Sequence, residues 1–73
     1  MATVSAQSRK FTVILEQEAQ ACTARCLELD VVSQGKSVGA AVDNAREAIA
    51  LHLQAHPKLK PKPVQVAIVE VEV

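Results

Sequence analysis

Two histidines stand four residues apart near the end of the longest periodic run in the chain, a spacing that lets two metal ligands share one face of a helix. They are His52 and His56. No Glu follows His52, as a His-Glu-x-x-His zinc motif requires, and the sequence places no third ligand beside the pair. Because a positive charge is favourable at the C-terminal end of a helix, structural or capping roles suit both side chains better. We therefore predict no metal site and no cofactor.

Four carboxylates come at predicted turns and strand ends, where acidic side chains could meet: Glu16, Glu18, Glu28 and Asp30. Nuclease chemistry with two metal ions needs several carboxylates that converge on one centre. Positions in turns are typical of solvated edge charges, and this is how we interpret the four. No Ser/His/Asp or Cys/His grouping has supporting spacing either. We expect no catalytic residue, and a protein that is not an enzyme.

The stretch Gln34-Gly35-Lys36-Ser37 has a glycine, a lysine and a serine ahead of a predicted helix, which is faintly like a phosphate-binding loop. The first glycine of that motif is missing, because position 30 is Asp. We interpret the stretch as architectural. Gly35 is expected to supply the flexible backbone that leaves the sheet, and Ser37 to cap the helix.

Two cysteines lie in the segment 21–29, which alternates like a strand. In a strand Cys22 and Cys26 would share one face about 13 Å apart, too far for a disulfide; in a helix they would be neighbours. We interpret both as small buried residues, too few for a zinc site. The first ten residues lack the apolar core of a secretion signal, and no run is long enough to span a membrane, so a cytoplasmic location is expected.

Lys58, Lys60 and Lys62, together with Arg9 and Lys10, could form a basic patch. The chain as a whole has a formal net charge of +0, and its single aromatic residue is a Phe. It therefore lacks both the global basic charge and the stacking platforms typical of nucleic-acid binding. A solvated loop that discourages edge pairing is the preferred interpretation of the lysines, with weak RNA contact by the 58–62 loop as the alternative.

With 73 residues the chain is expected to be a single domain, 1–73, whose small polar segment 1–8 is disordered. A domain of this size buries only about 60% of the surface of its unfolded chain. Such domains usually need disulfides, a metal or oligomerisation for stability. Since the cysteine pattern argues against the first two, we expect a homo-oligomer.

Apolar periodicity divides the chain into elements. Alternation predicts strands at 11–16, 21–29 and 29–34, with a hairpin connection over 16–20 whose competing interpretation is helical. After them, helical spacing extends from 38 to 56 and ends at Pro57. The expected buried stripe is Val38, Ala41, Val42, Ala45, Ile49, His52 or Leu53, and His56. The expected outward residues are Asp43, Asn44, Glu47 and Gln54.

A last strand is predicted over Val64–Val73, and its apolar phase changes part of the way along. Val64, Val66 and Ile68 occupy one face, whereas Val69, Val71 and Val73 occupy the other. Either a bulge lies near Ile68, or both faces of the strand end are covered. An exposed apolar strand is an aggregation hazard that a second copy would remove, so we expect oligomerisation through this strand or through the open face of the sheet.

The same segments carry a series of motifs. They are FTVILE at 11–16, Ala24-Arg-Cys26 followed by Glu28-Leu29, VSQG at 32–35, and Ala41, Asn44, REAI at 46–49 and Leu51. In order and spacing this series resembles the antitoxin-type HicB family over about residues 9 to 56. The usual pattern of that family has a Gly-Gly turn, an Ala-x-Cys-Pro-Glu-Leu strand, Ser-Gln-Gly, and a helix with Asn-x-x-Glu-Ala-Ile.

The resemblance implies a partial ribonuclease H-like fold of the α+β class in the order β-β-β-α-β. Its first three strands form an antiparallel meander, and the last strand is parallel to the first after a right-handed crossover through the helix. It also implies a toxin-neutralising half that binds a HicA-like ribonuclease toxin as its protein partner. The alternative is a homo-oligomeric domain of the same fold with an unrelated binding role.

The chain departs from the family pattern at several positions. Ala21 and Cys22 stand where Gly and an aromatic residue are usual, Leu27 stands for Pro, Asp30 for Gly, and Gly39-Ala40 for acidic residues. Antitoxins of this kind carry a second, DNA-binding part, for which a sequence that stops at Val73 has no room. We therefore expect no DNA binding from this chain. We also expect no membrane association, because its apolar runs are too short to span a membrane.

Overall fold

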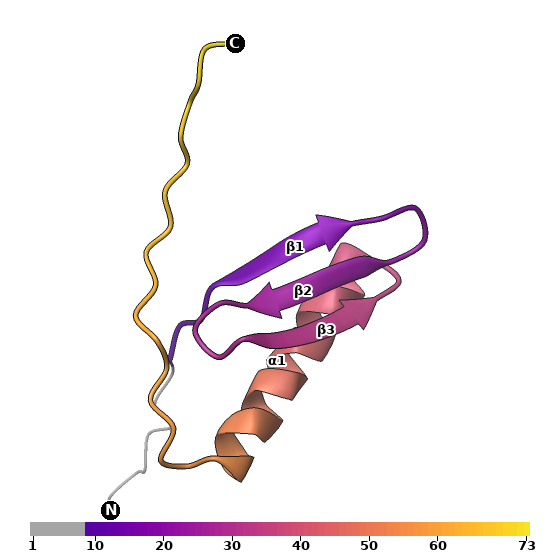
Figure 1. Cartoon of the computed structure of the whole chain (residues 1–73). Helices are drawn as coiled ribbons and strands as arrows, with labels where there is room; N and C mark the ends of the chain where they lie inside the picture. The colour runs from indigo at the N-terminus through magenta and orange to yellow at the C-terminus, as the bar shows by residue number, and fades with distance from the viewer. Residues whose placement is uncertain (1–8) are drawn as a thin grey trace, which may run out of the picture.

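The computed structural model describes residues 9–73, in which a three-stranded antiparallel sheet carries one helix on one of its faces (Figure 1). The strands β1 (Val13–Gln17), β2 (Cys22–Cys26) and β3 (Val31–Gly35) are neighbours in chain order, and helix α1 (Val38–Ala55) follows them. The predicted α+β class and the antiparallel meander are confirmed. The prediction of disorder for 1–8 falls outside the described residues.

Small side chains form the contact between sheet and helix. On β2, Cys22, Ala24 and Cys26 alternate with more exposed residues and are almost completely buried, as β-strand alternation requires. On α1, Ala41 and Ala45 lie one helical turn apart and pack against Cys22 and Ala24. Both cysteines are free and buried, as the sequence indicated. Because none of these residues projects far, the helix axis can lie close to the sheet.

Gly35 is needed for close approach, and this corrects the prediction of a flexible exit from the sheet. It is the last residue of β3, and its φ is not positive. A Cβ atom at this position would lie 2.7 Å from the carbonyl carbon of Ala40 and would also clash with the backbone nitrogen of Ala41. The first turn of α1 therefore rests directly on the backbone of β3, where only glycine leaves enough space.

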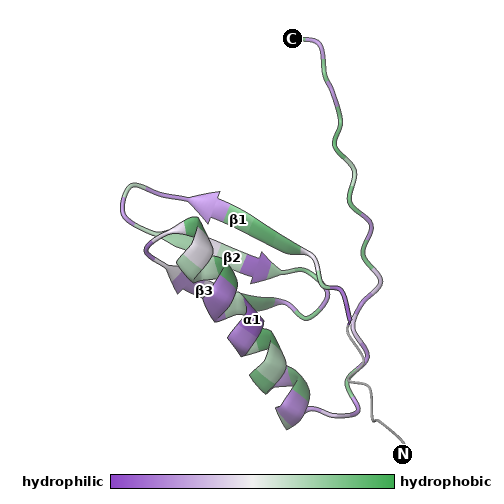
Figure 2. Cartoon of the chain, turned by 180° about the vertical axis from the view of Figure 1, so that it is seen from behind, coloured by the Kyte–Doolittle hydropathy of each residue, from purple (hydrophilic) through white to green (hydrophobic). Residues whose placement is uncertain are grey.

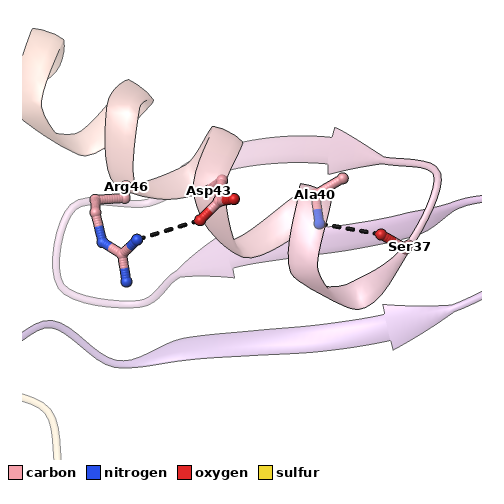
Figure 3. A network of polar contacts seen from close by, with 4 residues as sticks. All are labelled: Ser37, Ala40, Asp43 and Arg46. Carbon is pink, nitrogen blue, oxygen red and sulfur yellow. Dashed lines mark hydrogen bonds and ion pairs between the residues drawn. The ribbon is translucent and has the colours of Figure 1, made fainter.

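Helix α1 begins at the predicted cap. The backbone of Ser37 is extended, and its side-chain hydroxyl accepts a hydrogen bond of 3.1 Å from the backbone N–H of Ala40 (Figure 3). The helix ends at Ala55, and the backbone N–H of His56 still donates to the carbonyl of His52. Pro57 then prevents its continuation.

The buried face of α1 is narrower than the predicted stripe. Ala41, Ala45 and Ile49 are buried, whereas Val38 and His56, at the two ends of the predicted stripe, are exposed. Asn44, predicted to face outward, donates from its Nδ2 atom to the carbonyl oxygen of Gln34 at 2.7 Å. Asn44 is exposed, as predicted. Because α1 lies mainly over the β3 side of the sheet, an exposed residue beside the buried face still reaches the backbone of β3.

The turn between β2 and β3 contains a residue in the left-handed region. Asp30 has φ 59°, a conformation that Gly, Asn and Asp adopt more easily than other residues. Its short polar side chain fits this tight turn without the steric cost of a larger residue.

Beyond α1 the described chain has no further helix or strand. The segment 56–63, which follows α1, is held by two backbone hydrogen bonds of 3.0 Å: Leu59 donates to the carbonyl of His56, and Lys62 donates to the carbonyl of Glu28. This segment forms the root of the extended arm that follows. Residues 64–73, here named the C-terminal arm, then run in an extended path away from the sheet (Figure 1). The structure thus does not show the fourth strand or its parallel pairing. It also leaves both faces of the arm exposed, with Ile68 98% and Val69 74% accessible.

Candidate interaction surface

The face of the sheet opposite α1 is open and partly apolar. Ile14 on β1 and Val32 on β3 are 45% and 52% exposed, and both are cross-strand neighbours of Arg25 on β2. These three side chains alternate with the buried helix-facing residues and therefore point to the open side. Figure 2, which views the molecule from behind, shows α1 in front of the strands, so the helix covers only the other face. The open face combines apolar contact area with a cation able to pair with an acidic partner.

A second surface feature is a groove between the outer side of β1 and the helix. It has a volume of about 480 Å³. Its lining residues are Arg9, Phe11, Val13, Val42, Arg46 and Ile49. Here it is named the β1-edge groove. A neighbouring hollow of about 380 Å³ shares Arg9 and Phe11 with it and continues toward Leu53 and His56. The apolar middle of the groove lies beside the free edge of β1.

A polar cluster holds the chain together where β1 begins. The backbone N–H and the hydroxyl of Thr12 both donate to the carboxylate of Glu28, each at 2.7 Å. The backbone N–H of Leu27 donates to the carbonyl of Thr12, and the thiol of Cys26 lies 3.7 Å from the same carboxylate. Glu28 therefore ties the turn after β2 to the start of β1.

The cluster shifts the titration of two groups. The hydrogen bond from the Thr12 backbone N–H stabilises the charged carboxylate, so the pKa of Glu28 is lowered. Burial is the main reason that the pKa of the Cys26 thiol is raised, and the nearby negative charge of Glu28 adds to this effect. A thiol in this state is a poor nucleophile, because the thiolate is the reactive form. The cluster is thus suited to holding the fold.

The sequence did not identify this cluster. Thr12 and Glu28 are 16 residues apart, and the separate motifs that contain them do not indicate a contact between the two. The strand register pairs Val13 with Cys26, which places Thr12 close to Leu27 and Glu28. A correct register for the predicted hairpin is the one signal that would have indicated the contact.

The candidate metal-binding and catalytic residues do not converge on one centre among the described residues. The rings of His52 and His56 have centroids 4.8 Å apart, and residues 9–73 contain no group of three or more His, Cys, Asp and Glu that could hold a metal ion. Of the four carboxylates, Glu16 and Glu18 lie at the β1–β2 hairpin end of the sheet, whereas Glu28 and Asp30 lie at the opposite end. The four carboxylates therefore do not converge on one site, because the antiparallel register separates the two turns by the length of the strands.

The basic residues are partly brought together. Arg9 lines an open hollow of about 730 Å³ with Lys58 and Lys60, in the segment that follows α1. Lys62 is engaged through its backbone N–H with Glu28. The basic residues therefore lie around the root of the arm and one end of the β1-edge groove.

Comparisons with protein-family models, with curated proteins and with solved structures each returned no match. Within residues 9–73 the structure has no helix whose length and apolar character would let it cross a membrane. Fold and surface geometry are therefore the basis for a functional proposal.

Proposed function

We propose that this chain is a non-enzymatic protein-interaction domain that binds its partner on the open face of the sheet. The observation that carries the proposal is the exposure of Ile14 and Val32 on either side of Arg25, on a face with no covering helix. Burial of a Val or Ile side chain contributes about 1.5–3 kcal/mol, and a neighbouring Arg adds directional pairing. Such a combination is typical of the centre of a protein interface.

The motif series supports a specific version of this function. As a HicB-like antitoxin half, the domain would bind and neutralise a small HicA-like ribonuclease toxin, and its location would be cytoplasmic. Asp30 adds support, because its left-handed φ of 59° coincides with a glycine position of the HicB pattern. Arg25 would then face an acidic group of the toxin, and the apolar residues would cover the toxin surface around it.

The test is a pull-down of the product of the neighbouring open reading frame by the full chain. Ile14→Asp and Val32→Asp place a carboxylate on the open face, and each is expected to weaken binding at least tenfold. Leu51→Asp is the matched control, since Leu51 is an equally exposed apolar residue that lies on α1. Failure of the wild-type chain to retain any protein, or equal binding by all three variants, would contradict the proposal.

A second candidate function is favoured by the C-terminal arm. Its apolar residues are extended and exposed on both faces, which suits a homo-oligomeric domain of the same fold with an unrelated binding role. In either case we propose that residues 64–73 supply a fourth strand at the free edge of β1. The HicB resemblance implies that this strand is parallel to β1 and belongs to the same chain. The charges along the arm provide a separate indication of its orientation.

A further inference from the structure

The molecule carries a free strand edge at β1 and, in the C-terminal arm, an extended segment without a partner strand among the described residues. Strand β1 pairs only with β2 among the described residues, so its outer backbone N–H and C=O groups are available to another strand. The C-terminal arm is extended, and apolar residues run along its whole length (Figure 2). Strand addition at a sheet edge supplies backbone hydrogen bonds, while alternate side chains enter pockets beside the edge.

The β1-edge groove offers such pockets. Phe11 and Val13 line it from the chain that forms the sheet, Val42 and Ile49 line it from α1, and Arg9 lies at the end nearest the start of the chain. Every second residue of the arm has a complementary character: Val64, Val66 and Ile68 are apolar, and Glu70 and Glu72 are acidic. One face of the arm thus offers apolar and acidic side chains to a groove lined by apolar residues and by two cations, Arg9 and Arg46.

The charges select one orientation. With the arm antiparallel to β1, Val64 to Ile68 lie beside residues 17 to 13, and Glu70 and Glu72 continue beside Phe11 and Arg9. With the arm parallel to β1, the same two acidic residues pass the end of β1 and approach Glu18. Opposite charges across neighbouring strands are favourable, and like charges are unfavourable. The antiparallel orientation also uses the whole arm, whereas β1 alone is only five residues long.

The root of the arm shows which chain can provide this strand. Lys62 is bound through its backbone N–H to Glu28, which also holds Thr12, so the arm departs from the end of the sheet where β1 begins. An arm that turned back onto its own sheet would therefore run in the direction of β1, parallel to it. Pro61 and Pro63 have fixed φ angles and favour the extended departure seen in Figure 1.

We propose that the β1-edge groove is filled by the C-terminal arm of a second copy of this chain, antiparallel to β1, and that two copies exchange arms reciprocally. Reciprocal exchange about a two-fold axis uses the same surfaces on both copies and closes the assembly at a dimer. The inference rests on the proposed fourth strand at the β1 edge. It is independent of the toxin partner, because every test below uses the purified chain alone.

Cross-linking of mixed full-length chains tests the donor and the orientation. One chain carries Lys10→Cys and the other Val71→Cys, two exposed positions that become neighbours only in the antiparallel exchanged pair. The two are unfolded, mixed, refolded together and treated with a short bis-maleimide. A covalent dimer of twice 7.8 kDa is expected in the mixture and in neither chain alone. Wild-type chain reports any background from Cys22 and Cys26, which are buried.

A second pair reports the competing arrangement. Glu18→Cys and Val69→Cys in one chain become neighbours if the arm lies parallel to its own β1. An internal link in this double variant, without a covalent dimer in the first mixture, would overturn the proposal and leave the fourth strand in place. Absence of a link in both experiments would overturn the exchange and the fourth strand together.

Light scattering provides an independent measurement. Wild-type chain is expected to have the mass of a dimer. Val66→Glu is expected to raise the dimer dissociation constant at least tenfold, because it places a charge beside Leu15 on the helix-facing side of β1. Gln65→Glu, a charge on the other face of the arm, is the control and should leave it unchanged. Glu72→Lys should raise the dimer dissociation constant about two- to fivefold, and the double variant that also carries Arg9→Glu should have the wild-type dissociation constant. A wild-type monomer, or equal effects of Val66→Glu and Gln65→Glu, would contradict the proposal.

Discussion

At the scale of single residues, the two glycines of the chain have opposite roles. A Cβ atom on Gly35 would collide with the backbone of the first turn of α1, whereas one on Gly39 would meet nothing within 4 Å. The first glycine is therefore required by packing. The second lies in the helix without a packing reason and lowers helix stability, since its backbone loses more entropy on folding than that of alanine.

The pair gives a matched prediction. Gly35→Ala should lower the free energy of unfolding by about 1–3 kcal/mol, because the helix must move away from β3. Gly39→Ala should raise it by about 0.5–1 kcal/mol. Urea denaturation followed by circular dichroism measures both. Equal effects of the two substitutions would show that α1 does not rest on the backbone of Gly35.

The carboxylate of Glu28 makes the stability of the fold depend on pH. Its pKa is lowered in the folded chain, chiefly by the hydrogen bond from the backbone of Thr12. A carboxyl group with a depressed folded pKa contributes stability above its unfolded pKa of about 4.3, and this contribution is lost as the pH falls through the folded pKa. The contribution is therefore complete at neutral pH and fades in acid.

Glu28→Gln should destabilise the chain at pH 7, and the difference from wild type should shrink as the pH is lowered from about 5 to 3. The substitution keeps the size of the side chain but removes the charge that Thr12 binds. Urea titrations at several pH values measure the difference, with Glu47→Gln on the exposed surface of α1 as control. A difference that is independent of pH would rule out a role for the charge of Glu28.

Residue-scale features were only partly predictable from the sequence. Ser37 was recognised because an N-cap has a local signal, and the cysteines because strand alternation indicates burial. The steric role of Gly35 and the contact of Thr12 with Glu28 depend on strand register and helix position. Neither property is encoded in a short stretch of sequence, so reasoning from local patterns could not find them.

At the scale of elements, the helix depends on its first turn. Acidic residues are absent from that turn, so the hydrogen bond from Ala40 to Ser37 is the main stabilising contact at the start of α1. The ion pair of Asp43 with Arg46 in the next turn spans 3.2 Å between exposed side chains (Figure 3) and contributes little.

Ser37→Ala should therefore lower the free energy of unfolding by about 1 kcal/mol, whereas Ser37→Asp should maintain or raise it. Aspartate retains the accepting oxygen and adds a negative charge near the positive end of the helix dipole. Thermal unfolding of the three chains measures the effect. A loss of stability with Asp as large as that with Ala would show that the cap does not act through its side-chain acceptor.

Sequence periodicity predicted the helix and the three strands that the structure shows, but it also predicted a fourth strand that the structure does not show. Alternation placed three strands, and helical spacing placed α1, close to their observed bounds. The arm has the same alternation, but it has no partner strand within the described residues. A β-pattern indicates which side chains favour a sheet, but the backbone hydrogen bonds must come from a neighbour, and the sequence does not say which chain supplies it.

At the scale of the whole molecule, the chain is more extended than its length requires. The radius of gyration is 15.1 Å, whereas a compact domain of this size has about 11 Å. The arm contributes to the difference, since it reaches away from the sheet and from α1 (Figure 1). The open face and the β1-edge groove are separate surfaces, so a partner protein and a second copy would not compete for the same residues.

Relief of toxicity in growing cells tests the central claim most directly. The candidate toxin from the neighbouring open reading frame is expressed with the wild-type chain, with Ile14→Asp or with Leu51→Asp, each at matched levels. The account predicts that wild type and Leu51→Asp restore growth and that Ile14→Asp fails. Growth arrest with the wild-type chain, or full rescue by Ile14→Asp, would contradict a neutralising domain that binds through its open sheet face.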